Sequence, residues 1–157
     1  GFTASYLGKL NKNWNTSGSI TYTEGHTFHK DWNTSGPLSS IPPLFGRFEI
    51  NYSKDKFEAG ANLIFNAKKN IKDYNLIEGI DNHQQTPIVD ENATEDINKY
   101  YGTPSWMTIG LNGKYTLNEH WAVQAMITNL FDEHYKEFAS GVSAPGRNFS
   151  VSIMANF

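Results

Sequence analysis

The stretch that decides the fold is Trp14-Asn15-Thr16-Ser17-Gly18-Ser19-Ile20-Thr21-Tyr22. Its even positions carry the large apolar side chains Trp14, Ile20 and Tyr22, whereas every odd position is small and polar. Successive side chains of a β-strand point to opposite faces of the sheet, which gives a period of two. The stretch is therefore predicted to be a strand with one apolar and one polar face.

The same alternation recurs in six other runs, at residues 2–10, 44–52, 57–66, 107–117, 121–128 and 149–157. Most runs are about nine to twelve residues long; strands that cross a membrane need about 9–11 residues, against about 5–6 in soluble proteins. We therefore expect an all-β fold, an antiparallel sector of about seven strands from a transmembrane β-barrel. Alternation alone leaves open a soluble β-sandwich binding module, whose apolar face would pack on a second sheet.

Short and long connections alternate along the chain. The short ones lie at 11–13, 53–56 and 118–120, and the long ones at roughly 29–43, 69–103 and 130–146. Outer-membrane barrels have short periplasmic turns and long external loops, whereas loops beyond about 12–15 residues are uncommon in compact soluble domains. This asymmetry favours the membrane barrel and places the short turns on the periplasmic side.

Aromatic and charged residues are both distributed as a membrane-embedded sheet requires. By parity, the apolar face holds an aromatic cluster beside the short turns: Trp14, Tyr52, Phe57, Tyr115 and Trp121. Amphipathic rings concentrate at membrane–water interfaces, so this cluster is predicted to form a belt at one interface. The net charge of −3 is also localised, because residues 69–103 hold seven acidic residues and three lysines, a net charge of −4.

Composition excludes several other classes of protein. The 157 residues include no cysteine, which rules out disulfides, thiolate metal sites and a cysteine nucleophile. No apolar run approaches the length of about 20 residues that a transmembrane helix needs. The acidic balance offers no basic footprint for nucleic acid, so no nucleic-acid partner is expected.

Seven strands are an odd number, whereas bacterial single-chain barrels have even numbers. The sequence starts at Gly1 with neither an initiator methionine nor a signal peptide. We therefore expect residues 1–157 to be part of a larger barrel, with a small porin-like barrel as the alternative.

Two segments resemble the C-terminal region of TonB-dependent outer-membrane receptors. The first is Pro37-Leu38-Ser39-Ser40-Ile41-Pro42-Pro43-Leu44-Phe45-Gly46-Arg47. The second is Asn129-Leu130-Phe131-Asp132-Glu133-His134-Tyr135, followed by Ser143-Ala144-Pro145-Gly146-Arg147-Asn148-Phe149 and a terminal Phe157. The resemblance implies a 22-stranded barrel in the outer membrane of a Gram-negative bacterium. It also implies an N-terminal plug and earlier strands outside these residues, and import energised by the inner-membrane TonB complex.

The last predicted strand also resembles the C-terminal signal read by the barrel-assembly machinery. The residues that carry this resemblance are Phe149, Val151, Ile153 and Phe157, while Ala155 stands where an aromatic residue is common. The resemblance implies that machinery, together with lipid and lipopolysaccharide, as partners.

Candidate ligand contacts lie in the long loops. The resemblance implies a small nutrient ligand: siderophore-iron, haem, cobalamin or a glycan. The polar aromatic residues of the loops are its candidate contacts: Trp32, Tyr74, His83, Tyr100 and Tyr101. Tyr100 and Tyr101 are explained equally well as interfacial aromatics.

No catalytic residue, metal site or cofactor is predicted. A barrel-embedded protease or lipase would need converging Ser/His/Asp residues or paired carboxylates at the outer rim, and none is evident. His26 and His29 fall on opposite faces of an extended chain and are read as exposed loop residues. Asp90, Glu91, Glu95 and Asp96 offer oxygen ligands of the kind that Ca²⁺ prefers, but they lack a fixed spacing, which favours a solvated acidic loop.

Overall fold

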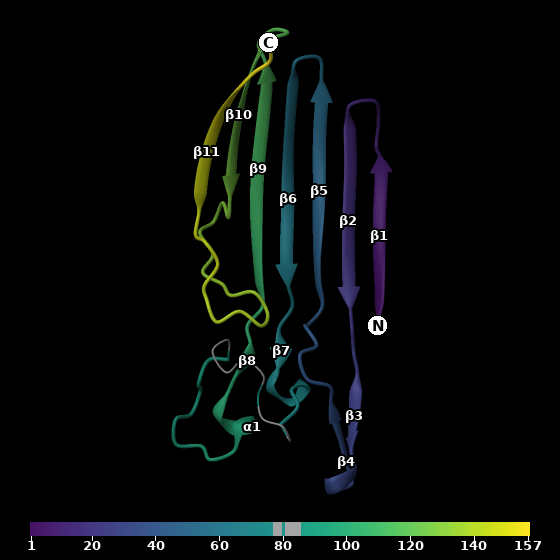
Figure 1. Cartoon of the computed structure of the whole chain (residues 1–157), viewed down its shortest axis with the longest axis vertical. Coiled ribbons are helices and arrows are strands. Elements are labelled where there is room, and N and C mark those ends of the chain that lie inside the picture. Colours follow the sequence, from purple (N-terminus) through teal and green to yellow (C-terminus); the bar gives the residue numbers. More distant parts are fainter. Residues whose placement is uncertain (77–79, 81–85) are drawn as a thin grey trace.

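The computed structural model describes residues 1–76, 80 and 86–157, apart from the side chain of Trp32. Seven strands form one sheet in which every neighbouring pair is antiparallel (Figure 1). In sheet order they are β1 (Phe2–Lys9), β2 (Trp14–Tyr22), β5 (Phe45–Lys54), β6 (Phe57–Asn66), β9 (Trp106–Thr116), β10 (Trp121–Thr128) and β11 (Asn148–Ala155). The predicted antiparallel sector of seven strands is therefore confirmed.

The strand ends differ slightly from the alternation pattern. Leu44, Leu117 and Phe157 continue the pattern but lie just outside strands β5, β9 and β11. The turn predicted at 53–56 contains only two residues, because Lys54 pairs with Phe57. Asp55 has a positive φ of 53°, the backbone conformation that a tight two-residue hairpin requires.

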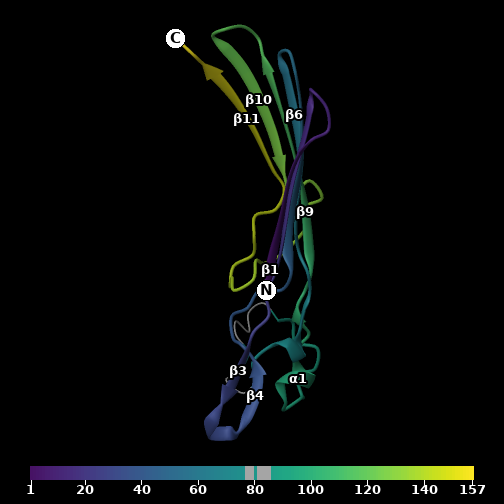
Figure 2. The ribbon, with the colours of Figure 1, turned by 90° about the vertical axis from the view of Figure 1, so that its right-hand side faces the viewer.

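The register keeps every apolar row on one face of the sheet. Across β5, β6 and β9, for example, Phe48 pairs with Leu63, and Leu63 pairs with Ile109. This apolar face is exposed: Phe48 retains 46% of its accessible surface and Val151 on β11 retains 72%. Viewed edge-on, the sheet is a single curved layer (Figure 2), and no second sheet covers the apolar face in the described residues.

The opposite face of the sheet is polar. The Lys114 ammonium on β9 donates to the Glu58 carboxylate on β6 at 2.9 Å. The hydroxyls of Thr3 and Thr21 form a hydrogen bond of 3.0 Å between β1 and β2. An exposed apolar face opposite a hydrogen-bonded polar face is the arrangement of a barrel wall between lipid and a wet interior.

The short turns all lie at one end of the sheet, where the predicted aromatic belt is observed. The rings of Trp14 and Tyr52 lie 4.9 Å apart, and those of Tyr52 and Phe57 lie 6.2 Å apart, centroid to centroid. Farther along the sheet, Phe157 meets Trp121 edge-on at 6.1 Å. These contacts make a band of rings next to the turns, as expected at a membrane interface.

The long connections lie at the other end and contain short elements (Figure 1). The loop predicted at 29–43 is largely a hairpin of β3 (His26–His29) and β4 (Thr34–Pro37), joined by the 3-10 helix η1 (Lys30–Trp32). Asn33 closes this hairpin with a φ of 46°. The stretch 69–103, which has no periodicity, contains β7 (Lys69–Asn70), the 3-10 helix η2 (Ile71–Asp73), α1 (Asp96–Lys99) and β8 (Gly102–Thr103).

Two further features complete the fold. In the described ranges, β1 and β11 form the two edges of the sheet and do not pair with each other, so the barrel is not closed. None of the described helices has the length and apolar character needed to cross a membrane.

Candidate ligand-binding surface at the long-loop end

Lys69 joins the three long loops. It is only 5% exposed, and its ammonium donates a 2.7 Å hydrogen bond to the carbonyl oxygen of Ile41 in the first long loop. The same ammonium lies 4.4 Å from the ring centroid of Tyr74 and 4.9 Å from that of Phe138 in the third loop. A buried cation is tolerated only where such partners replace water, so Lys69 holds the loops together.

A small core forms beneath this lysine. Tyr74 is 1% exposed, and its hydroxyl is hydrogen-bonded to that of Thr103, which is 2% exposed. Asn75, also 1% exposed, reaches the imidazole of His29 at 3.5 Å. The fully buried side chains in the described residues thus lie in the loops and not in the sheet.

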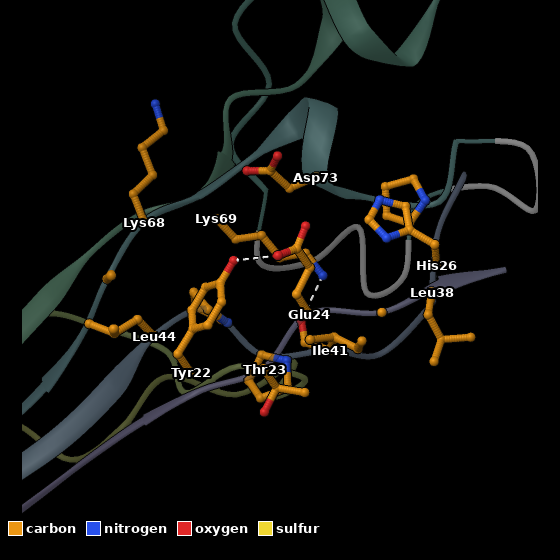
Figure 3. Close-up of a pocket in the computed structure, with 15 residues that line it drawn as sticks. Tyr22, Thr23, Glu24, His26, Leu38, Ile41, Leu44, Lys68, Lys69 and Asp73 are labelled. Atoms are coloured by element: carbon orange, nitrogen blue, oxygen red, sulfur yellow. Dashed lines mark hydrogen bonds between the residues drawn. The ribbon is translucent and has the colours of Figure 1, made fainter. Parts of the chain in front are cut away.

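A cavity of about 280 Å³ opens beside Lys69 (Figure 3). One side is apolar and proline-rich, formed by Pro37, Leu38, Ile41, Pro42, Pro43 and Leu44. The other side carries the Glu24 and Asp73 carboxylates, and the Tyr22 hydroxyl donates to Glu24 at 2.9 Å. Such a cavity suits a small amphipathic ligand group.

The segment that begins after β10 folds back on itself through a set of hydrogen bonds, which we call the loop clasp (residues 129–135 and 143–147). Asn129, 6% exposed with a φ of 49°, accepts from the Glu133 amide at 2.8 Å. Its own amide nitrogen donates to the carbonyl oxygens of Glu133 at 2.8 Å and Pro145 at 3.3 Å. All the hydrogen-bonding groups of this side chain are therefore engaged.

Asp132 completes the clasp. Its carboxylate accepts from the Arg147 amide at 2.7 Å, and that oxygen lies 2.7 Å from where a Cβ on residue 146 would stand. A side chain at position 146 would displace this carboxylate, so Gly146 gives it room to approach. These contacts give a physical reason for the spacing of the Asn129–Tyr135 and Ser143–Phe149 motifs.

The clasp places Tyr135 over Trp106 at the start of β9. The two ring centroids are 4.1 Å apart with an interplanar angle of 32°. Burial, together with the nearby Glu137 carboxylate, raises the pKa of Tyr135 above its usual value. A second cavity of about 300 Å³ adjoins this ring pair, lined by Thr86, Pro87, Thr103, Pro104, Ser105, Trp106, Glu133, His134, Tyr135 and Lys136.

The predicted ligand contacts that the structure describes differ in their surroundings. Tyr74 is buried under Lys69, whereas Tyr101 is 44% exposed and has the Lys68 ammonium 3.5 Å from its ring centroid. Tyr100 forms a β-bridge with Ile88. Trp32 ends η1 at the tip of the β3–β4 hairpin, and His83 lies outside the described residues. A ligand role for this set stays a prediction.

The acidic loop uses several carboxylates to organise its own backbone. The Asp90 carboxylate accepts from the Asn92 amide at 2.9 Å, and that of Glu95 accepts from the Asn98 side chain at 3.1 Å. Within the part of the chain that the structure describes, no three or more histidine, aspartate or glutamate side chains converge to hold a metal ion.

The assembly-signal residues lie at the edge of the sheet. Phe149, Val151 and Ile153 share the apolar face of β11, with exposed fractions between 69% and 73%. Phe157 lies beyond the strand end, against Trp121. Recognition by an assembly machinery stays a prediction.

Sequence reasoning missed Lys69 and Trp106 as residues of this surface. Lys69 is one of three lysines in an acidic loop, and Trp106 starts a strand; neither position carries a local signal of burial. The proline-rich side of the first cavity and the loop clasp, in contrast, coincide with the two motifs that resemble TonB-dependent receptors.

The single-layer sheet with an exposed apolar face, a polar face and loops gathered at one end defines a membrane β-barrel wall. The sequence model of the family described as "TonB dependent receptor-like, beta-barrel" matches residues 1–130, and the chain belongs to that family. Its members are outer-membrane proteins of Gram-negative bacteria, which locates this chain in that membrane.

Solved structures show the same fold. The copper transporter OprC has 24% sequence identity and a TM-score of 0.65 over 99% of this chain. The ferric enterobactin receptor PfeA of Pseudomonas aeruginosa, in complex with enterobactin, has 17% identity and a TM-score of 0.62 over 99% of this chain. FpvA of P. aeruginosa, bound to a heterologous pyoverdine, has 15% identity and a TM-score of 0.64 over 99% of this chain.

The chain spans about a fifth of the length of these structures: 22% of OprC, 22% of PfeA and 19% of FpvA. No curated protein matches it.

Proposed function

We propose that this chain forms part of the wall and the outer mouth of a receptor that imports a scarce small nutrient across the outer membrane. The observation that carries the proposal is the loop layer, by which we mean the three long loops at roughly 29–43, 69–103 and 130–146. Lys69 contacts all three beside the cavity of Figure 3. A barrel wall alone needs no such layer, whereas a receptor needs preformed cavities at its outer mouth. Membership of the TonB-dependent receptor family supports the same function.

The ligand class in this proposal is a metal chelate or a similarly scarce nutrient: siderophore-iron, haem, cobalamin or a glycan. Among the similar structures, one is called a copper transporter, another a ferric enterobactin receptor, and a third is bound to a pyoverdine. The cavity of Figure 3 is smaller than a drug-sized site of about 300–1,000 Å³, so it would hold one group of such a ligand. The chain would bind and pass the ligand without catalysing a reaction.

The proposal includes the rest of the receptor. Residues 1–157 would form a C-terminal segment of a 22-stranded barrel, preceded by further strands and a plug that contacts the TonB complex. The short coverage of the similar structures and the two unpaired edges of the sheet support this placement. The barrel-assembly machinery would read β11, and lipid and lipopolysaccharide would cover the apolar face.

The test is ligand uptake in a Gram-negative host that lacks its own receptors for the ligands offered. The receptor containing this chain is expressed, and uptake of radioactive iron bound to siderophores or haem, of cobalamin and of labelled glycans is measured with and without TonB. We expect uptake of one class that stops when TonB is deleted. Uptake of none of them, or equal uptake without TonB, would refute the proposal.

A matched pair of variants locates the binding surface. Leu38→Trp places a large ring in the cavity of Figure 3 and is expected to raise the KM for uptake about tenfold. Lys12→Trp adds the same side chain in a short turn at the opposite end and should leave uptake unchanged. Equal effects of the two substitutions would contradict the placement of the site.

A further inference from the structure

Two buried hydrogen-bond donors at the long-loop end of the sheet have no acceptor among the described residues. Asn66 ends β6 and Trp106 starts β9, and the two are directly paired across the strands on the polar face. Asn66 is 7% exposed. Among the described residues, its amide nitrogen and the indole nitrogen of Trp106 are the buried side-chain nitrogens and oxygens that lack a hydrogen-bond partner.

Such a pair requires an explanation, because buried polar groups in proteins are nearly always hydrogen-bonded. Because the two residues are directly opposite each other on antiparallel strands, their side chains are neighbours on the same face, with Cβ atoms typically about 4.5–5.5 Å apart. Both unpaired groups are N–H donors. Their complement is therefore a hydrogen-bond-accepting oxygen, and a cation is disfavoured.

The surroundings select the shape of the group that carries this oxygen. The Tyr135 ring lies 4.1 Å from the Trp106 ring and covers it, and the cavity of about 300 Å³ begins at the same two rings. His134 and Lys136 also line that cavity, next to Glu133. An engineered apolar cavity of about 150 Å³ holds a benzene molecule, so this space is sufficient for a substituted planar ring.

We propose that Trp106 and Asn66 form a binding subsite for a planar ligand group that carries a hydrogen-bond-accepting oxygen, such as an aryl carboxylate. The group stacks on the Trp106 indole, and its oxygen accepts from the indole N–H and the Asn66 amide. Tyr135 occupies the stacking position in the structure and moves aside when the ligand enters. The subsite rests on the proposed function only in that the planar group belongs to the imported nutrient.

The test measures the subsite directly with benzoate as the probe. The detergent-solubilised receptor containing this chain is labelled with ¹⁵N-tryptophan, and the indole N–H signal that disappears in Trp106→Phe is assigned to Trp106. Benzoate is expected to shift that signal downfield in a saturable manner. Cyclohexanecarboxylate, with the same charge but no planar ring, and benzylammonium, planar but cationic, should bind at least about tenfold more weakly.

Three substitutions separate the roles of the residues. Trp106→Phe keeps the ring and removes the donor, and Asn66→Leu removes the second donor; each should weaken benzoate binding about tenfold, followed by ¹⁹F signals of 4-fluorobenzoate. Tyr135→Ala should strengthen binding, because the competing ring is gone. Trp121→Phe, which removes an indole N–H at the short-turn end, is the matched control and should have no effect.

Unchanged binding in both Trp106→Phe and Asn66→Leu, or a Trp106 signal that benzoate does not move, would overturn the proposal. Melting temperatures of the variants establish that each is folded. Failure of nutrient uptake with intact benzoate binding would refute the proposed function alone. Uptake with no benzoate binding would refute the subsite alone.

Discussion

The two ends of the sheet are built by different means. At the short-turn end, the side-chain oxygens of Asn11 and Asn118 each accept two hydrogen bonds of 2.9–3.2 Å. The donors are the backbone amides of the residues two and three positions later in the chain. At the long-loop end, Lys69 contacts Ile41 and Phe138, which are far from it in sequence. The turns at the short-turn end are thus shaped by local asparagine side chains, and strand pairing brings them together, for example where the Lys56 ammonium donates to the Leu117 carbonyl oxygen at 3.0 Å. The long-loop end depends more on a buried side chain that contacts several loops.

Backbone geometry shows the same contrast. In the described chain, six non-glycine residues have a positive φ; Asp55 lies in a short turn, and the other five (Asn33, Ser40, Asn129, Asp132 and Ala139) lie in the long loops. Positive φ costs free energy for residues other than glycine and persists where surrounding contacts compensate. The sheet is therefore held mainly by strand pairing, whereas the layer of long loops depends on specific side chains.

The largest effect is expected from substituting an asparagine at the long-loop end. Asn129→Ala removes three hydrogen bonds from a 6% exposed side chain and should destabilise the loop clasp by about 3 kcal/mol. Amide hydrogen exchange in residues 129–147 should accelerate about a hundredfold. The matched substitution at the other end, Asn118→Ala, should cost about 1 kcal/mol and affect only its own turn. If hydrogen exchange accelerated equally around the two substituted asparagines, the two ends would not differ in their dependence on specific side chains.

A smaller but wider effect is expected from Lys69→Met, which keeps most of the aliphatic stem and removes the ammonium. The Ile41 carbonyl loses its donor, and the Tyr74 and Phe138 rings lose their cation, at a cost of about 2 kcal/mol. Hydrogen exchange should accelerate in all three long loops, while β5, β6 and β9 stay protected. Lys114→Met, which breaks the exposed pair with Glu58, is the control and should cost less than about 1 kcal/mol. Acceleration confined to one loop would show that Lys69 does not join the three.

The smallest effect concerns pH. Burial and Glu137 raise the pKa of Tyr135 above 10.0, so the folded loop favours the protonated phenol. Its contribution to stability is complete below pH 10 and is lost as the pH rises through the raised pKa. The difference in tyrosinate absorbance between the wild type and Tyr135→Phe should titrate with a midpoint above 10.0. A midpoint at or below that value would contradict burial of this ring under the clasp.

Much of the fold could be predicted because its signal is local. A strand's two faces follow from a period of two, so the parity of Trp14, Ile20 and Tyr22 already placed them on one face. The register then aligned these faces across all seven strands, because each pairing keeps apolar side chains opposite one another.

The candidate sites could be predicted only in part. The motif from Asn129 to Tyr135 marked the clasp as a unit, but its hydrogen bonds and the position of Tyr135 over Trp106 depend on where β9 meets the loop. Tyr74 was predicted to contact ligand, yet whether an aromatic loop residue is buried or exposed depends on which segment packs against it. The β3–β4 hairpin was missed because its two strands have four residues each, too few to show a period.

The strands, the alternation of short and long connections, the aromatic belt and the family were therefore all predictable from the sequence. Each of these depends on neighbours within about ten residues along the chain or on a recognisable motif. The burial of Lys69 and the pairing of Asn66 with Trp106, whose donors lack a partner among the described residues, follow only from the folded chain. Burial and pairing of this kind depend on segments that are distant in sequence and meet only when the sheet has formed.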